Sequence, residues 1–150
     1  MEQRLNVHEK GQPALKTLFG IGGYLKKSAI EHSLLELVSF RVSQLNSCAF
    51  CLDMHSKDAR AKGETEQRLY GLSAWHESPY YTSRERAAFA WAEAVTKCKV
   101  PDEVYHEAKK EFSDEELIDL TLSVTTTNTW NRINLAFPVE AGTYRVGQFG

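Results

Sequence analysis

Two adjoining helices are predicted by residues 32–63, which have the sequence HSLLELVSFRVSQLNSCAFCLDMHSKDARAKG. Apolar residues recur at steps of three and four over residues 32–45, which is the period of an amphipathic helix. Residues 46–47 are Asn and Ser, which favour turns and N-caps. A second helix is therefore expected to begin at Cys48 and to end at Gly63, because glycine suits a helix C-terminus.

Further helices are predicted on both sides of this stretch. A first helix is expected over residues 13–27, although its three glycines weaken it by roughly 1 kcal/mol each. Capping-box patterns occur at Thr82–Glu85 and at Ser113–Glu116. In a capping box, the side chain of a Ser or Thr and that of a Glu three positions later each accept a hydrogen bond from the other residue's backbone N–H. The first opens a helix over residues 83–97 and the second opens another. Pro101 fits the first turn of a helix between them.

The segment from 120 to 137, LTLSVTTTNTWNRINLAF, has a less clear pattern. Its alternating apolar residues and its β-branched threonines are typical of a strand. An isolated strand would leave its backbone groups unpaired, so we expect a helix here as well. The sequence thus predicts an all-α fold, a compact helical bundle.

Composition restricts the classes of function. The chain has 150 residues, 42% of them hydrophobic and 25% charged, which predicts one globular domain over residues 1–150. The net charge of -2 and the lack of a long Lys/Arg block argue against nucleic acid and an anionic membrane surface as partners. No stretch approaches the ~20 apolar residues of a membrane span, and no leader pattern is evident, so we expect a cytoplasmic protein.

Thiols are held reduced in the cytoplasm, so a C-x-x-C pair there is more easily explained by a chemical role than by a structural disulfide. Cys48, Cys51 and His55 are related as i, i+3 and i+7 on a helix, so they lie within an arc of roughly 60°. Cα atoms three apart on a helix are about 5 Å from each other, so the two cysteines could form a disulfide. The helix dipole favours a thiolate at Cys48, whereas His55 can act as a base for Cys51, and local physics does not decide between them.

Glu36 can join this group if the two helices fold back on each other at residues 46–47. Similar numbers of residues separate Glu36 and His55 from the turn, so at 1.5 Å per residue they lie level within about 3 Å. Packed helices are about 8–10 Å apart, a gap that these two side chains can close directly or through one water. A proton relay from Cys51 through His55 to Glu36 is therefore feasible.

Simpler interpretations compete with this one. A buried cysteine is often only a small apolar residue, and Glu36 alone would be taken for a solvated charge. Cys48, Cys51 and His55 also offer three zinc ligands, but the sequence has no second ligand pair to complete a tetrahedral site. Cys98 is interpreted as structural. Trp75, Trp91 and Trp130 are expected in the core. His32, His76 and His106 lack a motif and are expected to be surface residues or hydrogen-bonded polar residues.

The four residues Glu36, Cys48, Cys51 and His55 form the pattern E-x11-C-x-x-C-x-x-x-H. This pattern and its flanking residues resemble the alkylhydroperoxidase D-like branch of the carboxymuconolactone decarboxylase superfamily over residues 28–140. Four spaced residues with matching surroundings are far more specific than a lone C-x-x-C.

The resemblance implies an all-α fold, a homotrimer or homohexamer, and a thiol-dependent peroxidase that uses neither metal nor organic cofactor. It implies that Cys51 attacks a small hydroperoxide, that Cys48 resolves the sulfenic acid to a disulfide, and that Glu36 and His55 relay the proton. A thiol reductant or an adaptor protein would then restore the thiols. For assembly, the Ala-rich helix 83–97 and the aromatic residues Trp75, Tyr80 and Tyr81 are expected at an interface.

One position departs from the pattern. Well-characterised members carry a second histidine directly before the nucleophilic cysteine, where this chain has Phe50. The alternative within the superfamily is a lactone decarboxylase, in which Glu36 and His55 would act as acid and base without cysteine cycling. A non-enzymatic alternative is a zinc-stabilised or redox-sensing interaction module.

Overall fold

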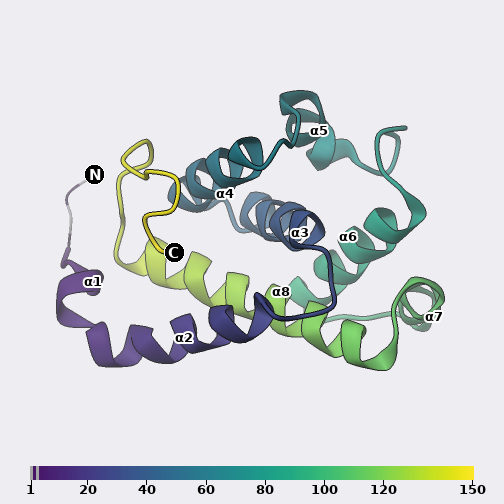
Figure 1. Ribbon diagram of the computed structural model, residues 1–150, viewed down its shortest axis with the longest axis horizontal. Coiled ribbons are helices and arrows are strands. Elements are labelled where there is room, and N and C mark those ends of the chain that lie inside the picture. Colours follow the sequence, from purple (N-terminus) through teal and green to yellow (C-terminus); the bar gives the residue numbers. More distant parts are fainter. Residues whose placement is uncertain (1, 3) are drawn as a thin grey trace.

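The computed structural model describes residues 2 and 4–150 of the chain, and all the regular structure in these residues is helical (Figure 1). The α-helices are α1 Val7–Lys10, α2 Gln12–Leu25, α3 His32–Leu45, α4 Ala49–Ala61, α5 Glu66–Gly71, α6 Ser83–Thr96, α7 Asp102–Glu111 and α8 Asp114–Ala136. A short 3-10 helix, Leu72–Ala74, continues α5. The predicted all-α fold class is confirmed.

The helix ends follow the signals in the sequence, with small differences. Both predicted capping boxes are formed, at Thr82 and at Ser113, where the Ser or Thr oxygen accepts from the N3 backbone and the N3 glutamate accepts from the cap. Cys48 is the N-cap of α4 and not its first helical residue. Pro101 likewise stands at the N-cap of α7, one position before the first turn.

Helix α3 lies in the middle of the molecule and packs against α4, α6 and α8 (Figure 1). Its side chains Leu37, Val38 and Val42 are fully buried, and they meet Phe89 of α6 and Leu120 of α8 in one core cluster. Each such side chain contributes about 1.5–3 kcal/mol by leaving water. This packing fixes the central helix from which Glu36 projects.

The side of α8 that is buried against α3 is polar in its second half. Thr127 shares a hydrogen bond of 3.1 Å with Ser39 of α3, and Asn131 donates to Ser43 of α3 at 3.0 Å. Both α8 side chains are buried, and each polar group has a partner, so their burial is tolerated. These inward-facing polar residues explain why the apolar pattern of this segment was unclear in the sequence.

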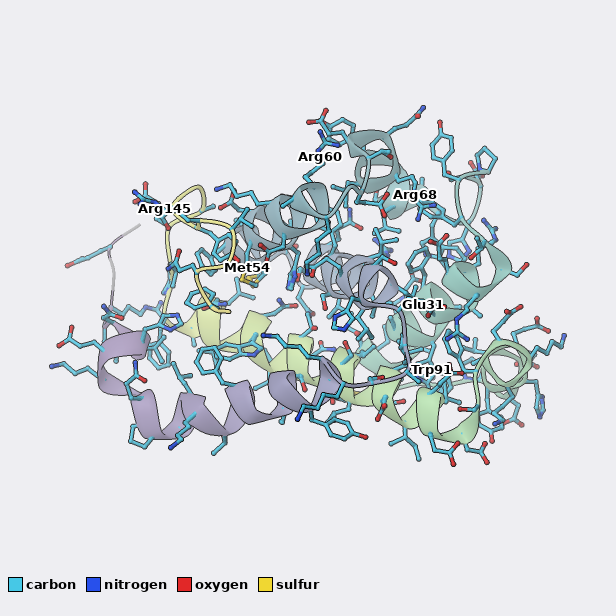
Figure 2. The ribbon with its side chains drawn as sticks, viewed as in Figure 1. Glu31, Met54, Arg60, Arg68, Trp91 and Arg145 are labelled. Atoms are coloured by element: carbon cyan, nitrogen blue, oxygen red, sulfur yellow. A yellow bond between two sulfur atoms is a disulfide. The ribbon has the colours of Figure 1, made fainter. Side chains whose placement is uncertain are left out.

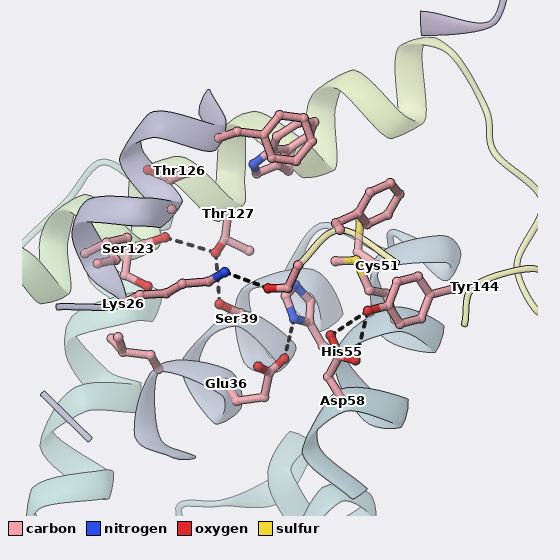
Figure 3. A pocket seen from close by; sticks show the side chains of 18 of the residues that line it. Lys26, Glu36, Ser39, Cys51, His55, Asp58, Ser123, Thr126, Thr127 and Tyr144 are labelled. Atoms are coloured by element: carbon pink, nitrogen blue, oxygen red, sulfur yellow. Dashed lines mark hydrogen bonds and ion pairs between the residues drawn. The ribbon is translucent and has the colours of Figure 1, made fainter. Parts of the chain in front are cut away.

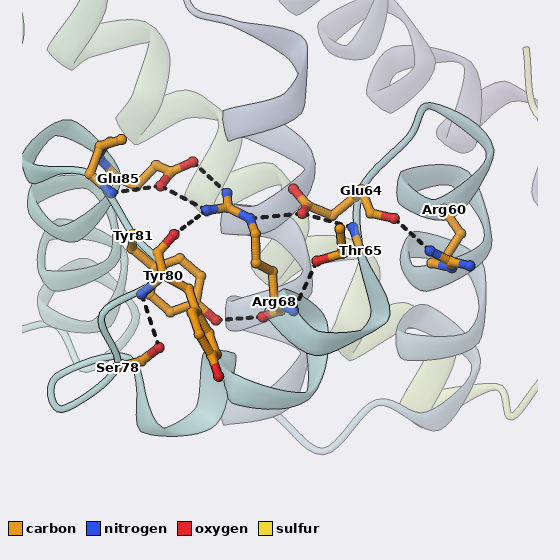
Figure 4. Close-up of polar contacts among 9 residues, drawn as sticks. Arg60, Glu64, Thr65, Arg68, Ser78, Tyr80, Tyr81 and Glu85 are labelled. Carbon is orange, nitrogen blue, oxygen red and sulfur yellow. Dashed lines mark hydrogen bonds and ion pairs between the residues drawn. The ribbon is translucent and has the colours of Figure 1, made fainter.

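Trp75 lies in the core, as one expectation had it, and the other expectation, that Trp75 and Tyr81 are exposed at an interface, is wrong. Tyr81 is buried against Phe89, and its hydroxyl donates to the backbone carbonyl of Arg68 (Figure 4). Trp75 is buried too, and its indole donates to Glu93 at 2.8 Å. Only Tyr80 of the three is exposed.

Arg68 connects α5 with the start of α6. Its guanidinium donates to Glu64 at 2.8 Å and to Glu85 at 2.6 Å (Figure 4). Glu85 is also the N3 residue of the capping box of α6. The α5 region is therefore held by the ion pairs of Arg68 and by the hydrogen bond from Tyr81.

Trp91 is buried as expected and donates to Thr121 of α8 at 2.9 Å, whereas Arg60 and Arg145 lie exposed at the edge of the molecule (Figure 2). Cys98 is exposed just after α6, so it is not a core residue. Every helix in residues 2 and 4–150 is too short or too polar to cross a membrane.

Candidate active site

The turn between α3 and α4 determines where the cysteines lie. Ser47 has a φ of 55°, in the left-handed region, which reverses the chain sharply. The Cys48 backbone N–H then donates to the Ser43 carbonyl at 3.1 Å. Asn46 donates to Asn131 of α8 at 2.9 Å, which attaches the turn to the long helix. The start of α4 is thus held by both α3 and α8.

Cys48 and Cys51 form a disulfide in this structure, with their Cα atoms 5.3 Å apart. The Cα separation agrees with the value of about 5 Å expected for positions three apart on a helix. Both cysteines are 1% exposed. Cys48 also caps α4, because its sulfur accepts from the Cys51 backbone N–H at 3.4 Å.

His55 and Glu36 are in direct contact, as the hairpin geometry predicted. His55 Nδ1 lies 2.6 Å from Glu36 Oε1, and both side chains are largely buried. The second carboxylate oxygen is 3.8 Å from the ammonium group of Lys62. A carboxylate on Nδ1 holds a proton there, which leaves Nε2 as the ring nitrogen that can take up or release a proton.

A cavity of about 400 Å³ brings these groups together (Figure 3). Cys51, His55 and Glu36 all line it, whereas Cys48 is not among its lining residues. The rest of the wall is mostly apolar and aromatic, with side chains from Phe19, Phe50, Trp130, Tyr144 and Phe149. Of the three tryptophans expected in the core, Trp130 is therefore a half-buried cavity wall.

The chain after α8 folds over this cavity. Tyr144 is only 4% exposed, and its hydroxyl donates to both oxygens of Asp58 at 2.9 Å (Figure 3). Burial and this hydrogen bond raise the pKa of Tyr144 to about 12. Lys57 binds the Tyr144 carbonyl at 3.0 Å, and Lys26 binds the Gly150 carbonyl at 2.6 Å. This wall could not be predicted from the sequence, because a short glycine-containing segment without regular structure has no periodic signal.

Phe50 contributes to the same wall. Its ring lies edge-on to that of Tyr144, with centroids 6.4 Å apart and an interplanar angle of 89°. Phe50 is buried. Phe50, the position that departs from the pattern described above, thus places an apolar ring next to Cys51. A histidine at this position would have been a further proton carrier.

A second residue that sequence analysis missed is Asn134 of α8. It is buried, it lines the cavity, and its Nδ2 donates to the Cys51 sulfur at 3.5 Å. Only the fold brings these two residues together, because 83 positions separate them in the chain. In residues 2 and 4–150, no group of three or more His, Cys, Asp or Glu side chains is arranged to hold a metal ion.

Comparison with known proteins identifies a matching family. The model of the carboxymuconolactone decarboxylase family matches residues 12–94, a range that contains Glu36, Cys48, Cys51 and His55. The uncharacterized protein YdfG of Bacillus subtilis is 42% identical over 139 residues, which are 91% of this chain and 95% of that protein.

Solved structures share the fold. ATU0492 from Agrobacterium tumefaciens is a protein of unknown function described as a candidate antioxidant defence protein AhpD. It superposes with a TM-score of 0.90 at 37% identity, over 95% of this chain and 100% of that one. The debrominase Bmp8 has a TM-score of 0.81 at 20% identity, over 90% of this chain and 74% of its own. At that identity the likeness extends to the helical fold alone.

Proposed function

Because this chain belongs to the carboxymuconolactone decarboxylase family, we propose that it is an alkylhydroperoxidase-like enzyme that reduces organic hydroperoxides with its C-x-x-C pair. The proposal depends chiefly on one observation. The residues of the Glu36–His55 hydrogen bond of 2.6 Å line the same largely apolar cavity as Cys51, one half of the Cys48–Cys51 disulfide. Peroxide reduction by a thiol requires a base that can take the thiol proton, and an imidazole oriented by a carboxylate in the same cavity as the cysteine can serve as that base.

Cys51 is the proposed nucleophile. Its position in the wall of the cavity supports this choice, whereas the sulfur of Cys48 caps the helix. His55 takes the proton of the Cys51 thiol, and Glu36 stabilises the imidazolium that results. The thiolate attacks the terminal oxygen of the hydroperoxide, the O–O bond breaks, and the alkoxide leaves as an alcohol with the proton from His55.

The second half of the cycle regenerates the thiols. The Cys48 thiolate attacks the sulfenic sulfur of Cys51, which forms the disulfide and releases water after protonation. A thiol reductant or an adaptor protein then supplies two electrons and two protons. Its identity, like the assembly into a trimer or hexamer, stays a prediction from the family resemblance.

Thiol titration tests the cycle directly. The chain has three cysteines, so the reduced protein should show three titratable thiols. Mild organic peroxide should leave one, on Cys98, and a dithiol reductant should restore all three. The variant Cys98→Ser provides a control, because it should go from two thiols to none. Loss of one thiol only, or of none, would contradict the cycling model.

The apolar wall predicts a preference for bulky substrates. Burial of on the order of 100 Å² of apolar surface at ~25 cal/mol per Å² should favour cumene hydroperoxide over hydrogen peroxide by roughly 10- to 100-fold in kcat/KM. Trp130→Ala should lower kcat/KM for cumene hydroperoxide while it changes the value for hydrogen peroxide little. Steady-state peroxide consumption measures both. Equal values for the two peroxides in the parent protein would argue against a binding role for the cavity.

The family name itself favours a second candidate, a lactone decarboxylase in which Glu36 and His55 act without the cysteines. Turnover of a carboxymuconolactone by protein with all thiols alkylated would establish that function. A redox-sensing module would instead be oxidised by peroxide in a stoichiometric step, and its peroxide consumption with a dithiol reductant would be no faster than that of a simple dithiol peptide.

A further inference from the structure

Asn134 is the one member of the inward-facing polar series on α8 whose amide is directed at sulfur. Thr127 and Asn131, which precede it on the same side, hydrogen-bond to serines of α3. Asn134 Nδ2 instead donates to Cys51 Sγ at 3.5 Å. Asn134 is 7% exposed, so this donor is largely shielded from bulk solvent.

The other end of the amide is unsatisfied. Asn134 Oδ1 is buried and has no hydrogen-bond partner among the residues that the structure describes. A buried acceptor without a partner destabilises the fold, and an apolar side chain of the same size would avoid that cost. In the disulfide form, therefore, Asn134 makes one weak bond to a neutral sulfur and leaves its carbonyl unpaired.

Reduction changes what this amide can do. The disulfide sulfur is a weak, uncharged acceptor, whereas a Cys51 thiolate carries a full negative charge in a site that is 1% exposed. A hydrogen bond to an ionised acceptor is about twice as strong as one between neutral groups. The same N–H group thus stabilises the reduced thiolate more than it stabilises the disulfide.

We propose that Asn134 is a further catalytic residue, one that stabilises the Cys51 thiolate through its side-chain N–H and thereby makes the disulfide easier to reduce. This inference rests on the proposed thiol chemistry of the site. It gives Cys51 a fixed partner that does not titrate, in addition to the base His55. It also means that the polar side of α8, beyond its structural role against α3, reaches the reacting sulfur.

Several titratable residues line the cavity together with Cys51, and a test of Asn134 must leave all of them unchanged. From the N-terminal half these are His8 of α1, Lys26 after α2, and His32 and Glu36 of α3. The others that share the cavity are His55 and Asp58 of α4, Lys62 after it, and Tyr144. All remain in place when Asn134 alone is replaced.

The test is the equilibrium of the full-length protein with dithiothreitol, in which disulfide plus dithiol gives dithiol plus oxidised dithiothreitol. At pH 8, Asn134→Leu should shift this equilibrium toward the protein disulfide by roughly 10- to 100-fold, the strength of a hydrogen bond to a charged group. The shift should fade at acidic pH, where the thiol is protonated in both proteins. The pH midpoint of Cys51 alkylation by iodoacetamide in Cys48→Ser should rise by about 1 to 2 when Asn134→Leu is added.

Two further variants separate this role from a structural one. Asn134→Asp keeps the size of the side chain but replaces the donor by an acceptor, so it should shift both measurements in the same direction if Asn134→Leu does not fold. Thr121→Val removes a hydroxyl of α8 that accepts from Trp91 at 2.9 Å and does not line the cavity, so it should leave both measurements unchanged.

An Asn134→Leu equilibrium and alkylation midpoint within about twofold and 0.3 pH of the parent protein would overturn the proposal, as would the same shifts in Thr121→Val. Neither measurement needs peroxide. A protein that fails to consume peroxide but shows the Asn134 shifts would refute the peroxidase function and leave this inference standing.

Discussion

Replacement of Cys51 by serine is expected to reduce peroxide consumption to the background rate, a loss of at least about 10³-fold. The hydroxyl of serine is far less acidic than a thiol, so His55 cannot generate a comparable nucleophile from it. In the structure Cys51 lines the cavity and accepts a hydrogen bond from Asn134. Peroxide consumption with a dithiol reductant measures the loss.

Cys48→Ser is the variant matched to Cys51→Ser, and the two should differ in whether sulfenic acid accumulates. A nucleophilic Cys51 without its resolving partner should accumulate as sulfenic acid, which mass spectrometry with a sulfenate trap detects. Cys51→Ser should give almost no trapped product. Sulfenate on Cys48 in Cys51→Ser would reverse the roles, since it would mean that the dipole of α4 activates the capping cysteine more than His55 activates Cys51.

His55→Ala and Glu36→Gln should each slow the reaction of Cys51 with peroxide, by roughly 10²–10⁴-fold if the two act together in proton transfer. The alanine variant removes the base. The glutamine variant can still accept from Nδ1, but it loses the negative charge that stabilises the imidazolium. Stopped-flow measurement of the first step, with both thiols intact, isolates this effect from reductant binding.

The double variant tests whether the pair is a unit. Because a relay loses most of its function with either member, the combined loss should be smaller than the product of the single losses. Glu66→Gln, which changes an exposed carboxylate on α5, should have no effect. Multiplicative single losses would show that Glu36 and His55 contribute separately in spite of their contact.

The sequence predicted the parts of the fold that local chemistry determines. The apolar spacing over residues 32–45 gave the bounds of α3, and the capping boxes at Thr82 and Ser113 gave the starts of α6 and α8. The hairpin between α3 and α4 also follows from local signals, so the Glu36–His55 contact could be predicted from residue counts alone.

What the sequence could not supply depends on partners that are distant in the chain. Asn131 and Ser43 are 88 residues apart, and Tyr144 and Asp58 are 86 apart, so no local pattern pairs them. The same limit explains the wrong expectation for Tyr81, whose aromatic ring suggested exposure at an interface. Tyr81 is buried, and its hydroxyl donates to the backbone carbonyl of Arg68, 13 residues earlier.

The cavity is assembled from two portions of the chain that differ in their chemistry. The range that the family model matches, residues 12–94, supplies the cysteines, the imidazole and the carboxylate. Much of the opposite wall lies outside it, in Thr126, Thr127, Trp130, Tyr144 and Phe149. Sequence changes in the stretch after α8, whether natural or engineered, can therefore alter the shape of the cavity while the cysteines, His55 and Glu36 stay the same. Chimeras that exchange the segment after α8 between relatives should therefore differ in substrate selectivity but not in the residues that react.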